Sequence, residues 1–118
     1  MTYISKGPLG QKHKNGVSEK IRAASMGKSC TLSIPGVCCY DASRTVGCHL
    51  RMFGHAGMSE KPDDVLMVDA CDRCHYVLDH RDLWPESQLG WDDVLRALME
   101  TLMRRRRDGL IILKGEKT

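Results

Sequence analysis

The strongest pattern of apolar positions lies in residues 91–107, near the C-terminal end of the chain. Apolar side chains recur there every three or four residues, the spacing of one face of an α-helix. Asp92 and Asp93 would fall in the first turn, where the helix dipole favours negative charge, and Gly109 would end the helix. The pattern predicts an amphipathic helix whose apolar positions are Trp91, Val94, Leu95, Leu98, Leu102 and Met103.

Two further helices are predicted upstream of this one. Residues 17–26 favour a short helix, because Ser18 can cap its start and Gly27 can end it. Residues 71–81 favour a helix over most of their length. Within that segment His75 and Asp79 are four residues apart, so they would share one helix face.

Strand-like segments are also present. Residues 30–38 alternate in polarity and are interrupted by a Pro-Gly turn, which predicts a hairpin-like knuckle. Residues 45–51 predict a second short strand, and residues 65–68 form a short apolar run. Residues 110–113 predict a β-like tail. Together these segments indicate a small α+β fold.

The composition bounds the fold and the cellular setting. The 118 residues suit one domain, yet only 5% are aromatic and 28% are charged. The core is therefore thin, and an additional cross-link would help to stabilise the fold. No apolar signal segment opens the chain, and no apolar run approaches the roughly 18 residues of a membrane span. We therefore expect a protein of the reducing cytoplasm, without membrane contact, in which clustered cysteines bind metal more often than they form disulfides.

The basic residues gather at the two ends of the chain. Residues 1–17 combine lysines with glycines and no hydrophobic period, and predict a flexible basic arm ahead of a single domain at residues 18–118. A block of four arginines, residues 104–107, lies near the other end. With a net charge of +3, these clusters would suit a polyanion such as nucleic acid, although a solvated surface explains them equally well.

Four of the six cysteines form two pairs that suit a closed tetrahedral zinc site. Cys71 and Cys74 make a C-x2-C pair, and Cys30 and Cys38 make a second, wider pair. Cys39 is an alternative ligand to Cys38. Two other interpretations remain, because buried cysteines can act as small apolar residues or as a redox pair. Of the remaining cysteines, Cys48 is expected to be a buried strand residue.

Two histidines bracket this cysteine set in the sequence. His49 ends the second predicted strand, and His75 follows the last cysteine on a predicted helix. If the helix packs on the strands, His49 would face the surface that carries His75 and Asp79. One group could then activate water while the others hold a divalent ion at a phosphate.

A series of short motifs runs in order through residues 20–83, about half of the chain. It comprises Cys30, the IPGVC run ending at Cys38, Thr45-Val46, Cys48-His49-Leu50-Arg51, Gly54, Gly57, Lys61-Pro62-Asp63-Asp64, Ala70-Cys71-Asp72-Arg73-Cys74-His75 and Asp79-His80-Arg81. This series resembles the YbcO family of nucleases from lambdoid prophages. The resemblance implies an HNH, or ββα-metal, nuclease core with a zinc-bound treble clef, to which a C-terminal helix is added.

The resemblance also implies roles for individual residues. His49 resembles the general base of HNH enzymes, and His75 and Asp79 resemble ligands of a catalytic Mg2+ or Mn2+ ion. Asp63 or Asp64, of which Asp64 is our choice, falls where HNH enzymes often place the Asn that orients the base. The chain departs from the pattern here, and again at the cysteine beside His49, where other HNH enzymes use Asp or His. DNA contacts are expected from Arg51, Lys61, Arg104, Arg105, Arg106 and Arg107.

The sequence therefore predicts a metal-dependent DNA endonuclease, a phosphodiester hydrolase of the HNH type from a phage or prophage. The alternative is a zinc module without catalysis that binds DNA or a phage or host protein. The amphipathic helix at residues 91–107 would either close the core or form the interface of a homodimer.

Overall fold

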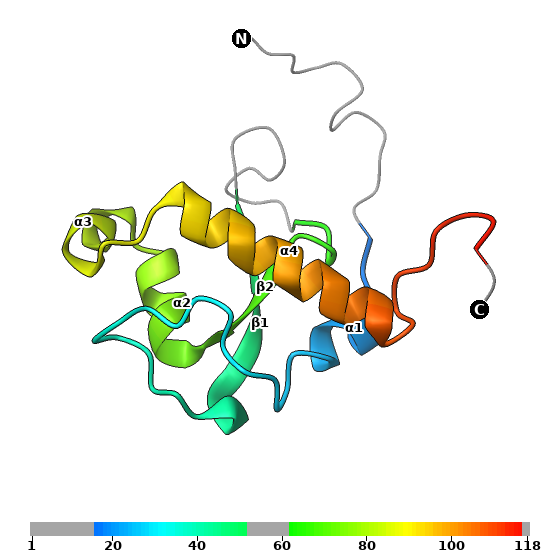
Figure 1. Ribbon diagram of the computed structural model, residues 1–118, viewed down its shortest axis with the longest axis horizontal. Coiled ribbons are helices and arrows are strands. Elements are labelled where there is room, and N and C mark those ends of the chain that lie inside the picture. The colour runs from blue at the N-terminus through cyan, green and yellow to red at the C-terminus, as the bar shows by residue number, and fades with distance from the viewer. Residues whose placement is uncertain (1–15, 52–61, 117–118) are drawn as a thin grey trace, which may run out of the picture.

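A computed structural model describes residues 16–51 and 62–116 of the chain (Figure 1). It is a small α+β fold whose sheet has two antiparallel strands in the described ranges, β1 (Thr45–His49) and β2 (Met67–Cys71). Their register runs from Thr45 opposite Cys71 to His49 opposite Met67. All five residues of β2 are buried, so this strand forms the centre of the molecule.

The long helix α4 (Trp91–Arg107) lies across β2 and covers the sheet (Figure 1). Its bounds match the periodicity of the sequence. Asp93 accepts a hydrogen bond from the Gly90 backbone N–H at 3.0 Å, which satisfies a donor at the start of the helix. Gly109 has a φ of +76°, a conformation that favours glycine, and the helix ends just before it.

The shorter helices surround the sheet. Helix α1 (Glu19–Ala23) begins where the Ser18 side chain accepts a hydrogen bond from the Ile21 N–H, as the sequence predicted for its cap. Helix α2 (Asp72–Leu78) follows β2 directly and ends before the predicted position. Two short 3-10 turns, η1 (Ala42–Arg44) and η2 (Arg81–Leu83), and the one-turn helix α3 (Trp84–Ser87) complete the elements.

Two strand predictions were wrong. Residues 30–38 form a loop with a turn at residues 35–37. Within the described segment only the Thr31 N–H donates to β2, to Asp69 O at 2.7 Å, and one bond does not make a strand pair. The Ser33 N–H donates to Cys30 Sγ, and the Val37 and Cys38 N–H groups both donate to Ile34 O. The expected β-like tail at residues 110–113 is also irregular. Leu110 donates instead to Arg105 O and so finishes α4.

A buried charged network joins the turn after α1, strand β2 and helix α4. Asp69 on β2 is fully buried, and its carboxylate accepts hydrogen bonds from Arg105 at 2.8 Å, from Arg104 at 2.9 Å and from Ser25 at 2.7 Å. The Thr101 hydroxyl in turn accepts from the Asp69 N–H. Because a buried charge is costly unless it is paired, this network fixes where α4 sits on the sheet. Among the described helices none has the length and apolar character to cross a bilayer.

Candidate functional site

The structure brings together the Sγ atoms of Cys30, Cys38, Cys71 and Cys74, all within 4.8 Å of one another. We call these residues the four-cysteine group. The first two come from the loop before β1, whereas the other two come from the end of β2 and the first turn of α2. Three of the four are buried, and Cys30 is half-buried. The group is a set of soft donors that could hold a metal ion.

Backbone N–H groups point at three of these sulfurs. The donors are Ser33 to Cys30 at 3.3 Å, Tyr40 to Cys38 at 3.3 Å and Cys74 to Cys71 at 3.5 Å. Such bonds favour thiolates, and Cys71 also sits at the N-cap of α2, where the helix dipole favours negative charge. The local backbone therefore suits charged sulfur ligands.

The thiols of the four-cysteine group differ in pKa. A hydrogen bond from the Cys74 thiol lowers the pKa of Cys30 to about 4, and the same bond, together with burial, raises the pKa of Cys74. Burial raises the pKa of Cys38 to about 11. Burial acts to raise the pKa of Cys71, but hydrogen bonds from Cys39 and Cys74 outweigh it and lower the pKa. A bound cation would favour loss of the remaining protons.

The two remaining cysteines are not members of this group. Among the described residues, Cys39 forms a second close set with Cys71 and Asp72, and it is Cys38 of the adjacent pair that joins the four. Cys48 is fully buried in β1, and its Sγ is 3.6 Å from Val46 O. Burial raises the pKa of Cys48, which keeps it a neutral strand residue as expected.

His49, the last residue of β1, forms a 2.8 Å hydrogen bond between its Nε2 and Oδ1 of Asp64. The other carboxylate oxygen of Asp64 accepts from the Ser18 N–H at 2.6 Å and from Arg22 Nε at 2.8 Å. Asp63 points elsewhere, toward the backbone N–H groups of Gly16 and Val65. Of the two candidate aspartates, it is Asp64 that contacts the histidine.

Asp64 is held in its charged form although it is almost completely buried. Burial acts to raise the pKa of Asp64, but the hydrogen bonds from Ser18, His49 and Arg22 outweigh it and lower the pKa. A carboxylate can only accept hydrogen bonds, so the hydrogen of the Asp64 contact belongs to Nε2 of His49. In the neutral form of the ring, this contact leaves the lone pair on Nδ1.

His49 opens onto a cleft of about 410 Å³ that lies between β1, the end of α2 and the start of α4. We call it the histidine cleft. Its polar lining consists of His49, Arg51, Asp79 and Arg81, and Trp84 and Trp91 form part of its apolar wall. His75 is one turn back on α2, where its Nε2 lies 3.0 Å from Oδ2 of Asp79. The structure thus joins His49 and Asp79 in one cleft and couples His75 to it through Asp79.

Comparison with known proteins places the chain. The family model described as "Putative nuclease YbcO" matches residues 19–109. The chain is 30% identical over 91 residues to the "Putative nuclease YbcO" of Escherichia coli strain K12 and, to the same extent, to that of Enterobacteria phage 82. These matches cover 77% of this chain and 95% of each relative. The chain belongs to the YbcO family.

A solved structure from Escherichia coli strain K-12, described as a "putative bacteriophage protein", supports the same relationship. It is 28% identical to this chain, with a TM-score of 0.61, and the match covers 76% of this chain and all of the other. The YbcO family match includes every described residue of the four-cysteine group and of the histidine cleft.

The arginine block of this YbcO family member is divided between the interior and the surface. Arg105 is buried and paired with Asp69, and Arg104 bonds Asp69, Ser29 and Glu100. Arg106 pairs with Glu116, whereas Arg107 is exposed. Lys61 lies outside the described residues, as do positions 1–15 of the predicted basic arm.

Sequence reasoning missed several residues that build the site. Arg22 of α1 supports Asp64 and was not among the predicted site residues. Asp69, the one charged residue within the five-residue β2 segment MVDAC, was a signal that an internal cation pairs with it. Trp84, Trp91 and Arg81 gave no local signal, because only the turn after α2 brings them to the histidine cleft.

Proposed function

We propose that this chain is a metal-dependent DNA endonuclease of the HNH type that hydrolyses phosphodiester bonds with His49 as general base. The observation that carries the proposal is the hydrogen bond between His49 Nε2 and the buried, charged Asp64 at the edge of the histidine cleft. A base in this role must be oriented by a partner and must reach a cleft that admits substrate. Membership of a family described as nucleases supports the same reaction class.

In this mechanism, Nδ1 of His49 accepts a proton from a water molecule while the oxygen of that water attacks phosphorus. The bond between phosphorus and the leaving ester oxygen breaks, and that oxygen takes up a proton from solvent. Asp64 holds the ring in one orientation and stabilises the imidazolium that forms. Its own position is set by Ser18 and Arg22, so the strand, α1 and the segment before β2 all contribute to orienting the base.

His75 and Asp79 would hold the divalent ion, Mg2+ or Mn2+. Their side chains already converge to 3.0 Å on successive turns at the end of α2. Mg2+ is commonly bound through one or two protein groups, with substrate phosphate and water completing its shell, so this small donor set fits it. When bound, the ion would neutralise charge on the phosphate and acidify water.

The four-cysteine group would hold one structural zinc ion, in the manner of a treble clef. A tetrahedral site with Zn–S bonds of about 2.3 Å has sulfurs about 3.8 Å apart. Cys38 Sγ and Cys71 Sγ are 3.9 Å apart, close to this separation. Four sulfurs leave no open position, so zinc would stabilise the fold and take no part in hydrolysis.

DNA would meet the protein at the histidine cleft, where Arg51 lies beside His49. Arg107 is the exposed member of the arginine block and the best placed of the four for a phosphate. Arg104 and Arg105 are engaged with Asp69, so their contribution would be to hold α4 in position. Arg106 and Lys61 remain proposed contacts that depend on how the DNA approaches.

The test is incubation of purified protein with supercoiled plasmid in Mg2+, in Mn2+ and without divalent ions. We expect nicking or cleavage with a divalent ion, and its loss in His49→Ala. His80→Ala is the matched control, because His80 is an exposed histidine just after α2 that stacks on Tyr76 and does not line the histidine cleft. A His49→Ala protein that cleaves at the parental rate would refute the general-base assignment.

The second candidate is a zinc module that binds DNA or a phage or host protein without catalysis. One observation favours it: in residues 16–51 and 62–116, His75 and Asp79 have no third metal-ligating side chain close to them. Absence of cleavage by the parent protein with either ion, on supercoiled, linear and single-stranded DNA, would favour this candidate.

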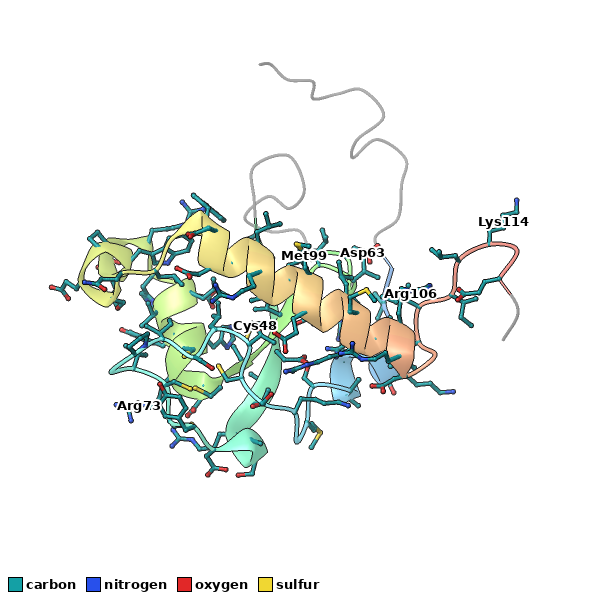
Figure 2. All side chains as sticks on the ribbon, viewed as in Figure 1. Cys48, Asp63, Arg73, Met99, Arg106 and Lys114 are labelled. Carbon is teal, nitrogen blue, oxygen red and sulfur yellow. The ribbon has the colours of Figure 1, made fainter. Side chains whose placement is uncertain are left out.

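A homodimer is proposed through the outer face of α4. Leu95, Met99 and Met103 are exposed along one side of this helix, and Met99 is seen on its outer edge in Figure 2. Asp92 flanks this apolar stripe at its start and Arg107 at its end. Two copies packed antiparallel would therefore pair opposite charges at both ends of the stripe.

Met99→Glu should convert a dimer to a monomer in light scattering. A parent protein that is monomeric at all concentrations would exclude the interface.

A further inference from the structure

Arg81 is held against two indole rings at the edge of the histidine cleft. Its guanidinium carbon lies 4.6 Å from the centroid of the Trp91 ring and 5.0 Å from that of Trp84. The two rings meet edge to face, with centroids 4.9 Å apart. Trp84 is buried, and its Nε1–H donates to Val77 O at 3.0 Å, so it anchors this arrangement in the core.

Among the residues that the structure describes, the Arg81 guanidinium makes no hydrogen bond and no ion pair, unlike Arg104, Arg105 and Arg106 of the arginine block. Cation–π contact positions a guanidinium without using its N–H groups. Arg81 is therefore a cation held in position by the two rings, and its N–H groups are available to a ligand.

Trp91 offers the second half of a binding site. Its side chain is 46% exposed even though the ring touches Arg81 and Trp84. It lines the same cleft as His49 and Asp79. An exposed indole beside a free guanidinium matches the two parts of a nucleotide, since a base stacks on an aromatic ring and a phosphate oxygen accepts from Arg.

We propose that Arg81 and Trp91 form a subsite for one unpaired DNA nucleotide next to the scissile phosphate, with Trp84 as its support. This rests on the proposed function and adds a substrate class to it: DNA that is single-stranded at the point of cleavage. Inside a duplex both faces of each base are covered by its neighbours, so an internal base can stack on Trp91 only where it is unpaired. Arg81 binds the phosphate of that nucleotide, and Arg51 lies on the same cleft wall for the neighbouring one.

The chain provides its own probe, because Trp84 and Trp91 are its two tryptophans. The experiment titrates the zinc-loaded full chain with a 12-nucleotide single strand and, separately, with a 12-base-pair blunt duplex, in buffer without Mg2+ or Mn2+. We expect the single strand to quench the tryptophan fluorescence and the duplex to quench it far less. In Trp84→Phe, where Trp91 is the remaining fluorophore, the quenching should persist.

Variants at the subsite give the decisive comparison. Trp91→Leu should weaken single-strand binding about 5- to 150-fold, the range for loss of one base–aromatic stack, whereas Trp91→Phe should keep most of the affinity. Arg81→Gln should weaken binding and lower the slope of log affinity against log salt by about 0.7, the value for one single-strand phosphate. The matched control is Arg73→Gln, because Arg73 is an exposed arginine of α2 that does not line the cleft (Figure 2).

Affinity is measured by anisotropy of a labelled strand, so that variants lacking Trp91 can be compared, and each variant is checked for zinc content and melting temperature. Unchanged affinity in both Trp91→Leu and Arg81→Gln would overturn the subsite, whether or not the parent cleaves DNA. Equal quenching by single strand and duplex would also overturn it. Selective binding lost in both variants would support the subsite even in a protein that cleaves nothing, so its fate is separable from that of the nuclease proposal.

Discussion

The four-cysteine group and the histidine cleft are built on the same helix, α2, in opposite ways. At the start of α2, Cys71 and Cys74 join two loop sulfurs in a compact and mostly buried set. At its end, Asp79 faces an open cleft of about 410 Å³ with His49 and Arg51. A closed ligand set stabilises and an open one admits substrate. The seven-residue helix α2 thus connects the proposed structural metal site with the proposed catalytic cleft and fixes their spacing.

The largest effect should come from removing one sulfur of the four-cysteine group. Cys74→Ser removes one of the four sulfurs and should cost several kcal/mol of unfolding free energy, a large part of the whole stability of a small domain. Thermal melting with metal analysis measures it, and we expect about one zinc per parent chain. Cys39→Ser is the control, since its sulfur is outside the four-cysteine group. If Cys74→Ser has the same melting temperature as the parent, the four-cysteine group is not a structural metal site.

The next effect should appear at the other end of α2 and leave stability almost unchanged. His75→Ala should lower cleavage at limiting Mg2+ by about 10- to 100-fold, and a higher ion concentration should restore part of the rate. His49→Ala should not be restored in this way, because it removes the base and not an ion ligand. Rates measured over a range of Mg2+ concentrations separate the two. Equal behaviour of both variants would contradict the different roles.

Asp64→Asn should show that the cleft also contributes to stability, by about 2 kcal/mol at neutral pH, because charge-assisted hydrogen bonds are lost. The pKa of Asp64 is lowered on folding, so its contribution is complete above the unfolded value of about 4 and is lost as the pH falls through the folded value. Denaturant unfolding at several pH values should therefore find the parent more stable than Asp64→Asn at pH 7. The gap should close in acid, and a gap that does not change with pH would contradict this assignment.

The smallest effect should be at the edge of the molecule. Arg107→Gln should weaken DNA binding a few-fold at low salt and reduce the salt slope by about one, with no change in sequence preference. Lys114→Gln is a suitable control, because Lys114 is also exposed and lies on the C-terminal tail beyond α4 (Figure 2). An unchanged slope for Arg107→Gln would mean that DNA does not reach the end of this helix.

Prediction from the sequence worked best where the controlling forces are local. The bounds of α4 follow from apolar spacing, the acidic first turn and a glycine stop, all of which can be read in a short window. Reliance on a local pattern also produced the wrong strand prediction for residues 30–38. Their alternating polarity resembles a strand, but beyond the bond from the Thr31 N–H to Asp69 O of β2 their backbone N–H groups bond locally, to Cys30 Sγ and Ile34 O.

The arginine block shows what a local pattern cannot decide. Four consecutive basic residues suggest one charged surface, yet consecutive helix positions are about 100° apart and point in different directions. Arg105 turns inward to Asp69, and Arg107 turns to solvent. The partner that separates them lies 36 residues away on β2, beyond the reach of any local pattern.

By itself the sequence determined the long helix, the cap of the first helix, the pairing of cysteines and the presence of two histidines and two adjacent aspartates between them. Tertiary structure alone decided that Cys38 and not Cys39 joins the four-cysteine group, that Asp64 and not Asp63 contacts His49, and that Arg81 rests on two tryptophans. The physical reason is the range of the forces. Propensity and periodicity act over a few residues, whereas a hydrogen bond or a ligand set depends on distances that exist only when β1, β2 and α2 are packed together.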